Sequence, residues 1–241
     1  FVNKIICGDC LKVLKEIPDE SIDLVFTDPP YNVSYPNKIF KDYRSSKNGD
    51  IRMDFGEWDY NYNPIPFLEE SKRVLNRYGS IIVWTSEQLF GIYRDWFAKN
   101  MHPKQTLVWV KTNPLPQFRL TGYRQATELL FWALKNKNTK NNPNFIFQSQ
   151  KEMTNVFCAP IVGGKERVKD KDGNTAHPTQ KPLSITKEII RRHCRETGIV
   201  LDPFCGVGTT CVAAKELNRN FIGIELNPEY CKIIEKRLSI V

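Results

Sequence analysis

Short apolar runs alternate with segments of helical periodicity along almost the whole chain of 241 residues. The apolar runs are rich in Ile, Val, Phe and Trp, and most are apolar on both faces, which is typical of strands in a sheet covered on both sides. The predicted strands are Lys4–Cys7, Asp23–Thr27, Ser80–Thr85, Thr106–Lys111, Glu128–Leu134, Ile199–Asp202 and Phe221–Glu225. The predicted helices are Cys10–Glu16, Ile65–Asn76, Glu87–Asn100, Leu183–Arg195, Thr209–Leu217 and Pro228–Leu238. This alternation predicts an α/β fold with one doubly wound, mainly parallel, Rossmann-like sheet of about seven strands.

Two features depart from simple alternation. Thr106–Lys111 and Glu128–Leu134 have no helical pattern between them, so we expect an antiparallel hairpin with a long connecting loop. Tyr35–Asn63 and Asn136–Ala176 are polar segments, and loops of this length are uncommon unless they are functional or disordered. The length fits a single domain, 1–241, with an inserted segment. Within the helix predicted over Leu183–Arg195, the apolar spacing predicts one core-facing side, formed by Ile185, Ile189, Ile190 and His193.

The chain is basic, with 35 Lys and Arg against 27 Asp and Glu and a net charge of +8. A basic surface favours a polyanionic partner, although a generic basic protein has the same composition. Seven cysteines are an odd number, which does not resemble a disulfide scaffold. Cys7 and Cys10 have CxxC spacing without a second pair, so we expect thiols rather than a metal site. No apolar run approaches a membrane span and no signal-peptide pattern is present, so we expect a cytoplasmic protein with no membrane partner.

A strand, a tight glycine turn and a helix are predicted around Asp202–Thr210. Gly206 and Gly208 let the backbone approach a ligand closely, and the helix N-terminus offers N–H groups to an anion. A dinucleotide fingerprint would need a third glycine where Cys211 stands, so the carboxylate of S-adenosylmethionine fits better than a pyrophosphate. Glu225 follows Gly208 by 17 residues, about where an acid accepts both ribose hydroxyls in nucleoside-binding folds. The alternative for this acid is a helix cap.

Asp28-Pro29-Pro30-Tyr31 follows another predicted strand. An amino nitrogen on adenine or cytosine is a poor nucleophile because its lone pair is delocalised into the ring, and acceptors aimed at its hydrogens favour rehybridisation. Asp28 offers a carboxylate, and Pro29 offers a carbonyl on a backbone that the two prolines restrict. Tyr31 can stack on a base taken out of the double helix. The alternative is a proline turn with a capping Asp.

The run Asp28–Tyr31 resembles motif IV of the amino DNA methyltransferases, and Phe204-x-Gly206-x-Gly208 resembles motif I. The order of these motifs along the chain, with motif IV first, is similar to the β class. Cys7–Cys10 resembles motif III, Asn113–Arg119 resembles the stretch after motif VIII, and His177–Pro182 (HPTQKP) resembles the entry to motif X. The resemblance implies a catalytic half over 1–134, a target-recognition segment over 136–176 and a cofactor-binding half over 177–241. It also implies S-adenosylmethionine as the methyl donor.

Residue roles follow from this resemblance. The target base would be held by Asp28, Pro29, Pro30 and Tyr31. The cofactor would be bound by Asp9, Cys10, Asp28, Pro203, Phe204, Gly206, Gly208, Thr209, Thr210 and Glu225. Lys181 would pair with the cofactor carboxylate, although a surface lysine explains the sequence equally well. DNA would be contacted by Lys38, Lys41, Arg44, Lys47, Arg119, Lys165, Arg167 and Lys169. We also expect Tyr35–Asn63 to be mobile until DNA binds.

The implied activity is site-specific methylation of double-stranded DNA at adenine N6. The base flips out, its amino nitrogen attacks the sulfonium methyl in line, and a proton leaves to water. Asp28 resembles the adenine set, because Ser is more usual for cytosine N4. N4-cytosine methylation, an RNA methyltransferase, an oxidoreductase and a catalytically silent DNA-binding protein stay open. A C5-cytosine enzyme would need a Pro-Cys dipeptide, which the chain lacks. A homodimer and a cognate restriction endonuclease also stay open as partners.

Overall fold

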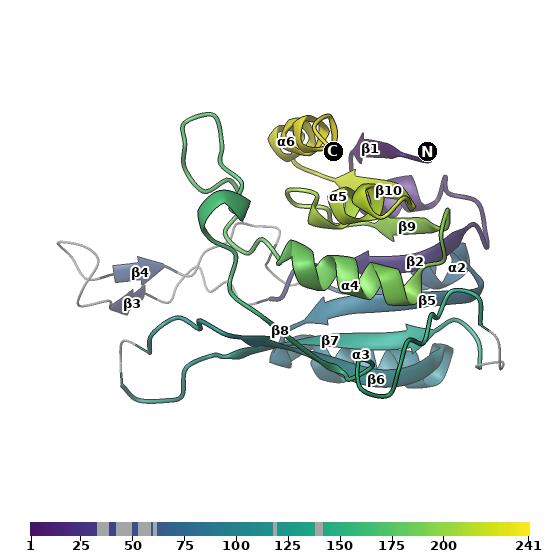
Figure 1. Cartoon of the computed structure of the whole chain (residues 1–241), viewed down its shortest axis with the longest axis horizontal. Coiled ribbons are helices and arrows are strands. Elements are labelled where there is room, and N and C mark those ends of the chain that lie inside the picture. The colour runs from purple at the N-terminus through teal and green to yellow at the C-terminus, as the bar shows by residue number, and fades with distance from the viewer. Residues whose placement is uncertain (33–38, 42–49, 53–58, 60–61, 118–119, 138–141) are drawn as a thin grey trace.

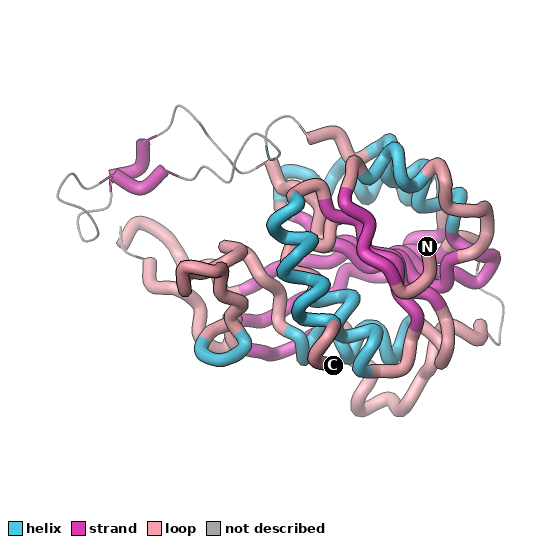
Figure 2. The backbone as a smooth tube through the Cα atoms, turned by 90° about the horizontal axis from the view of Figure 1, so that it is seen from above, coloured by secondary structure: helices cyan, strands magenta, loops and turns pink. Residues whose placement is uncertain are grey.

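One eight-stranded sheet organises the molecule (Figure 1). The computed structural model describes residues 1–32, 39–41, 50–52, 59, 62–117, 120–137 and 142–241. The strands of the large sheet are β1 (Lys4–Cys7), β2 (Ile22–Thr27), β5 (Leu75–Thr85), β6 (His102–Lys111), β7 (Thr127–Leu134), β8 (Val156–Ala159), β9 (Ile199–Asp202) and β10 (Asn220–Glu225). Their order is β1-β10-β9-β2-β5-β7-β6-β8. A separate antiparallel pair is formed by β3 (Ile39–Lys41) and β4 (Asp50–Arg52), which lies away from the sheet in Figure 2.

Helices cover both faces of the sheet. Their bounds are α1 (Cys10–Leu14), α2 (Ile65–Val74), α3 (Glu87–Asn100), α4 (Leu183–His193), α5 (Thr209–Glu216) and α6 (Pro228–Leu238), with a 3₁₀ turn at Gly164–Glu166. On β2, Leu24 and Phe26 pack with α4, α5 and α6, whereas Val25 packs with α1, α2 and α3. The side chains of a strand alternate between the faces, so an apolar run such as β2 contributes to two cores.

The strand order reverses between β9 and β2. The strands β1, β10, β9, β2 and β5 are parallel, and the chain leaves β2 toward β5 but leaves β9 toward β10. Ligands of open α/β sheets bind outside the carboxyl ends of the strands at such a reversal. The fold therefore places its best candidate site at the ends of β9 and β2.

The predicted fold class and hairpin are confirmed. β6 and β7 pair antiparallel, and β7 also pairs antiparallel with β5. The predicted inner face of α4 is buried, with Ile185, Ile189, Ile190 and His193 at most 3% exposed. The predicted helix end at Asn76 is wrong, because α2 ends at Val74 and Leu75 already pairs with Ile22 in the sheet. Tertiary pairing overrides the local helical pattern there.

An eighth strand lies within the polar segment that the sequence suggests is a loop. Val156–Ala159 forms β8 and pairs parallel with the last residues of β6. The indole nitrogen of Trp109 donates to the carbonyl oxygen of Ala159 at 2.9 Å. Four apolar residues inside a polar segment are too short a run to reveal a strand, so only the open edge of β6 makes this one possible.

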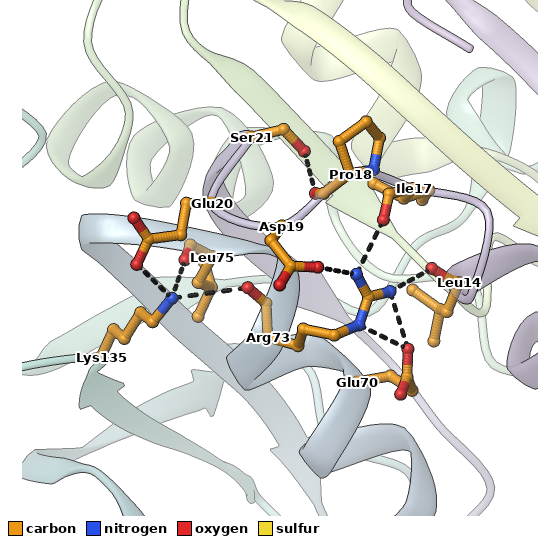
Figure 3. A network of polar contacts seen from close by, with 10 residues as sticks. All are labelled: Leu14, Ile17, Pro18, Asp19, Glu20, Ser21, Glu70, Arg73, Leu75 and Lys135. Carbon is orange, nitrogen blue, oxygen red and sulfur yellow. Dashed lines mark hydrogen bonds and ion pairs between the residues drawn. The ribbon is translucent and has the colours of Figure 1, made fainter.

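The amino ends of the strands are fastened by a polar network (Figure 3). Arg73 donates to the carbonyl oxygens of Leu14 and Ile17 at 2.6 and 2.9 Å, and it pairs with the carboxylates of Asp19 and Glu70. At the end of β7, Lys135 pairs with Glu20 at 3.0 Å and donates to the carbonyl oxygen of Leu75 at 2.6 Å. These contacts join α1, α2 and the starts of β2 and β5, so this part of the edge is structural. No helix among the described residues has both the length and the apolar character needed to cross a membrane.

Candidate active site

The two stretches singled out in the sequence meet at neighbouring strand ends. Leu24 pairs with Val200 and Val25 with Leu201. Beyond these pairs, the hydroxyl of Thr27 donates to Oδ1 of Asp202 at 2.6 Å. The predicted convergence of the Asp28 turn and the glycine turn is therefore confirmed.

The glycine turn after β9 needs glycine for steric reasons. Gly206 and Gly208 have φ angles of +53° and +79°, in the left-handed region that favours glycine. A Cβ on Gly208 would lie 2.5 Å from Cγ2 of Ile234. Gly208 is the N-cap of α5, so the amides of the first helical turn, which includes Thr209 and Thr210, have no carbonyl partner within the helix. These amides form a ready site for a carboxylate.

Asp202 places a buried carboxylate between the two turns. It is 3% exposed, and its Oδ1 also accepts from the backbone N–H of Phe204 at 3.1 Å. Burial raises the pKa of Asp202 to about 6, even though hydrogen bonds from Thr27 and Thr210 favour the charged form. A bound cationic group would relieve this cost. The sequence reading did not single out Asp202 as a ligand-binding residue, because a strand-ending Asp is also a common turn residue.

Glu225, Asp9 and Cys10 lie at the ends of the next two strands. Glu225 accepts from the backbone N–H groups of Gly206 at 2.7 Å and Asn227 at 2.8 Å. The N-cap of α6 is Asn227, whose side chain accepts from the N–H of Glu229, so the alternative of a helix-capping role for Glu225 is wrong. Burial raises its pKa. Asp9 caps α1 by accepting from the N–H of Lys12 at 3.1 Å. Burial raises the pKa of the Cys10 thiol to about 12, so this thiol is protonated and is no nucleophile at neutral pH.

The turn Asp28–Tyr31, the candidate catalytic turn and called the catalytic turn from here on, holds the Asp28 carboxylate by two contacts. Oδ1 of Asp28 accepts from the hydroxyl of Tyr31 at 2.6 Å, and Oδ2 lies 2.5 Å from Nζ of Lys181. Pro29 and Pro30 are buried. Burial raises the pKa of Asp28, although Lys181 and Tyr31 both favour its charged form. The carboxylate is thus partly desolvated and oriented before any ligand binds.

Residues beyond the predicted motif fix the backbone of this turn. The N–H groups of Tyr31 and Asn32 donate to Oδ1 of Asp59 at 2.7 and 2.9 Å, and the hydroxyl of Ser86 donates to the carbonyl oxygen of Tyr31 at 2.9 Å. Asn32 has a φ of +56°, and its side-chain amide makes two hydrogen bonds with the backbone of Tyr62. Asn tolerates left-handed backbone better than most residues, which is the one local signal that could have identified Asn32.

Lys181 lies inside the site and is no surface lysine. Its side chain is 8% exposed, and Nζ lies 3.5 Å from Oε2 of Glu128 in addition to its contact with Asp28. Burial alone would lower the pKa of Lys181, but Asp28 and Glu128 together raise it. The sequence reading missed Glu128, because an acid at the start of an apolar strand usually faces solvent.

His177, the first residue of the HPTQKP run, lies against the glycine turn. A Cβ on Gly206 would lie 3.2 Å from Nε2 of His177, and the imidazole meets the ring of Tyr230 edge-on at 5.3 Å. Burial, together with the charges of Lys181 and Arg167, lowers the pKa of His177 to about 4. A single run of six residues thus brings a neutral imidazole to one turn and the Lys181 ammonium to the other.

The predicted DNA-contacting residues are only partly described. Lys165 and Lys169 are exposed, consistent with the prediction. Arg167 donates to the carbonyl oxygens of Val162, His177 and Pro178, so its guanidinium supports the backbone. Lys38, Arg44, Lys47 and Arg119 lie outside the described residues, as does the side chain of Lys41. Their roles stay predictions.

A family model described as DNA methylase, for N6 and N4 methyltransferases, matches residues 22–236. The chain belongs to this DNA methylase family. Among curated relatives, it is 38% identical over 250 residues to the Type II methyltransferase M.HinfI of Haemophilus influenzae, covering 99% of this chain and 68% of that protein. It is 34% identical over 249 residues to the Type II methyltransferase M2.LlaDCHI of Lactococcus lactis subsp. cremoris, covering 96% of this chain and 87% of that one.

Solved structures agree with the family assignment. The methylase superposes on M1.HpyAVI in its complex with SAM with a TM-score of 0.74 and 28% identity, covering 98% of each chain. It shares the fold of the PvuII DNA methyltransferase (cytosine-N4-specific), with a TM-score of 0.74, 22% identity and coverage of 97% and 85%. The amino DNA methyltransferase resemblance is therefore confirmed, whereas the base that is methylated is not distinguished.

Proposed function

We propose that this DNA methylase transfers a methyl group from S-adenosylmethionine to the N6 amino group of adenine within a specific site in double-stranded DNA. The observation that carries the proposal is the hydrogen bond between Thr27 and Asp202, which holds Asp28 beside the glycine turn. The Type II relatives support the site-specific part of the proposal.

The residues at the strand ends fit S-adenosylmethionine. Its carboxylate suits the first-turn amides, which include those of Thr209 and Thr210, and its cationic groups suit the buried carboxylate of Asp202. Glu225 would take the ribose, Asp9 and Cys10 would flank the adenine, and Pro203 and Phe204 would border the methionine. When bound, S-adenosylmethionine supplies an electrophilic methyl group. The SAM complex of M1.HpyAVI, which has the same fold, supports this choice.

The catalytic turn fits an exocyclic amine. The carboxylate of Asp28 and the carbonyl of Pro29 would accept the two amine hydrogens, so the nitrogen lone pair is freed for attack. Tyr31 would stack on the flipped base, and the lost proton would pass to water. Asp28 supports adenine over cytosine. The intact turn argues against a silent DNA-binding protein, and the absent third glycine argues against an oxidoreductase.

A labelled-methyl assay on unmethylated DNA tests the proposal when it is followed by nucleoside analysis. We expect N6-methyladenine. The proposal would give way to cytosine-N4 methylation if N4-methylcytosine formed, and to an RNA methyltransferase if only RNA were methylated. It would give way to a catalytically silent DNA-binding protein if no methyl group were transferred. Asp28→Ala should cut transfer by orders of magnitude while S-adenosylmethionine still binds. Asp95→Ala removes an exposed carboxylate from α3 and is the matched control. Retained turnover in Asp28→Ala would refute the proposed role of Asp28.

Target recognition by 136–176, pairing into a homodimer and a cognate restriction endonuclease stay predictions. DNase footprinting, sedimentation and a search for an accompanying nuclease activity would test them in turn.

A further inference from the structure

Four charged side chains of alternating sign form a line behind the catalytic turn. Asp28 meets Lys181 at 2.5 Å, Lys181 lies 3.5 Å from Glu128, and Glu128 meets Lys111 at 2.8 Å. They come from the end of β2, the segment before α4, the start of β7 and the end of β6. Their formal charges cancel, so the line is neutral as a whole.

Each of the two ammonium groups lies near at least one aromatic ring. Nζ of Lys181 lies 5.2 Å from the ring centre of Tyr31 and 5.1 Å from that of Trp84, and Nζ of Lys111 lies 5.3 Å from the ring of Trp109. The side chains of Lys111 and Lys181 are 12% and 8% exposed. Charges in such surroundings are weakly screened, so removing one of them strongly changes the pKa values of its charged neighbours.

The line is asymmetric at Lys181. Its contact with Asp28 is a short charge-assisted hydrogen bond, whereas Oε2 of Glu128, at 3.5 Å, makes a longer and weaker ion pair. Oε2 is buried and has no hydrogen-bond partner among the described residues, while Oε1 is paired with Lys111. A buried acceptor without a donor is unfavourable, so Glu128 has an oxygen available for Lys181.

The free oxygen of Glu128 matters for Asp28, because Asp28 already has two donors. In this structure one of its oxygens accepts from Tyr31 and the other from Lys181. A target amine that donates to Asp28 would add a third donor to this carboxylate, which it would then share with Tyr31 and Lys181. If Lys181 moves toward Glu128, Asp28 gains acceptor capacity while the ammonium keeps an anionic partner.

We propose that Glu128 is a positioning residue for methyl transfer, which takes over Lys181 when Asp28 accepts the target amine. The inference rests on the proposed role of Asp28, and it holds for an adenine or a cytosine amine alike. Lys111 supports the role: burial alone would raise the pKa of Glu128, but Lys181 and Lys111 together lower it, so Glu128 is a carboxylate at neutral pH.

Glu128→Gln tests the inference, because it removes the charge and keeps the shape. With saturating S-adenosylmethionine and DNA, we expect the single-turnover rate to fall about 10- to 100-fold, because a small displacement of a group at the reacting centre can cost up to about 10²-fold. The dissociation constant for S-adenosylmethionine should change by less than about threefold, because Glu128 acts through Lys181 and Asp28.

The pH profile separates positioning from a structural role. Lys181 faces Asp28, Tyr31 and Glu128, with His177 on its own segment and Lys111 behind Glu128. In Glu128→Gln it loses one anionic neighbour and its pKa falls, so the alkaline limb of the rate profile should move to lower pH. In Glu128→Asp the charge is kept but the reach is shorter, so we expect an intermediate rate and an alkaline limb near that of the wild type.

Glu196→Gln, at an exposed position on the opposite edge, is the matched control. A wild-type rate in Glu128→Gln, or a reduced rate with an unmoved alkaline limb, would overturn the inference. If Glu128→Gln does not fold, a wild-type rate in Glu128→Asp overturns it and a reduced rate supports it. Asp28→Ala is run alongside: if it stays active, the proposed function fails, whereas an inactive Asp28→Ala with an unaffected Glu128→Gln removes only the inference.

Discussion

The hydroxyl of Thr27 and the carboxylate of Asp202 are 2.6 Å apart, although 175 residues separate them in the chain. Both side chains are buried, at 1% and 3% exposed. The bond joins the catalytic turn to the glycine turn at the place where the strand order reverses. The two halves of the site therefore cannot separate without breaking a buried hydrogen bond to a carboxyl group.

Thr27→Val should lower the free energy of unfolding by about 1–3 kcal/mol, because it leaves the buried Asp202 with one donor fewer. Urea denaturation measures the loss. Thr85→Val is the matched control, since Thr85 is also a buried strand-ending threonine but donates only to the carbonyl oxygen of Ser86. Equal losses in the two variants would show that the bond to Asp202 has no special weight.

Asp202→Asn should change the pH dependence of stability. The pKa of Asp202 is about 6 in the folded protein and about 3.9 for an unperturbed Asp. The folded state therefore binds this proton more tightly, and the stabilisation is lost as pH rises through 4 to 6. The variant lacks this loss, so it should gain about 1–3 kcal/mol relative to wild type between pH 4.5 and 7.5. A difference independent of pH in urea titrations would contradict this.

Tyr31→Phe should move the acidic limb of the rate profile to higher pH. The Tyr31 hydroxyl favours the carboxylate form of Asp28, so its removal raises the pKa of Asp28 further. The phenyl ring keeps the stacking surface, whereas Tyr31→Ala should also weaken binding of target DNA by about 1–3 kcal/mol. Rate profiles and DNA titrations of both variants separate the two effects. Identical acidic limbs in wild type and Tyr31→Phe would argue against the hydroxyl's role.

Arg73→Met should destabilise the fold without reaching the site. Its guanidinium satisfies two carbonyl oxygens and two carboxylates at the amino edge of the sheet (Figure 3). We expect a loss of about 1–3 kcal/mol in unfolding free energy, with single-turnover methyl transfer unchanged at a temperature where the variant is folded. Arg94→Met, at an exposed ion pair, is the control. A slowed transfer in Arg73→Met would mean that the two edges are coupled.

Lys165→Gln and Lys169→Gln should each weaken DNA binding at low salt, if these exposed lysines contact phosphates. Each lost contact should reduce the slope of log affinity against log salt by about 0.9. Arg167→Gln should instead lower local stability, because its donors already serve backbone carbonyls. Unchanged slopes for both lysine variants would place the DNA elsewhere on the protein.

Much of the sheet could be predicted because its strands are apolar on both faces. Runs such as Ile22–Thr27 and Ile199–Asp202 have no alternative to burial, and the helices between them have clear apolar faces. The glycine turn and the Asp28 turn could be found for a related reason, since each needs particular residue types at adjacent positions. Strand β8 could not, because Val156–Ala159 has no burial pattern of its own until the edge of β6 is available.

The sequence alone therefore determined the fold class, the two turns and the family, because these depend on local steric and hydrophobic requirements. Only the tertiary structure decided that Lys181 is buried between Asp28 and Glu128, and that Asp59 and Asn32 hold the catalytic turn. Those contacts join residues far apart in the chain. The sequence does not show whether a charged side chain is solvated by water or paired with an opposite charge. Burial and partner, which set its pKa and its role, exist only once the strands are placed side by side.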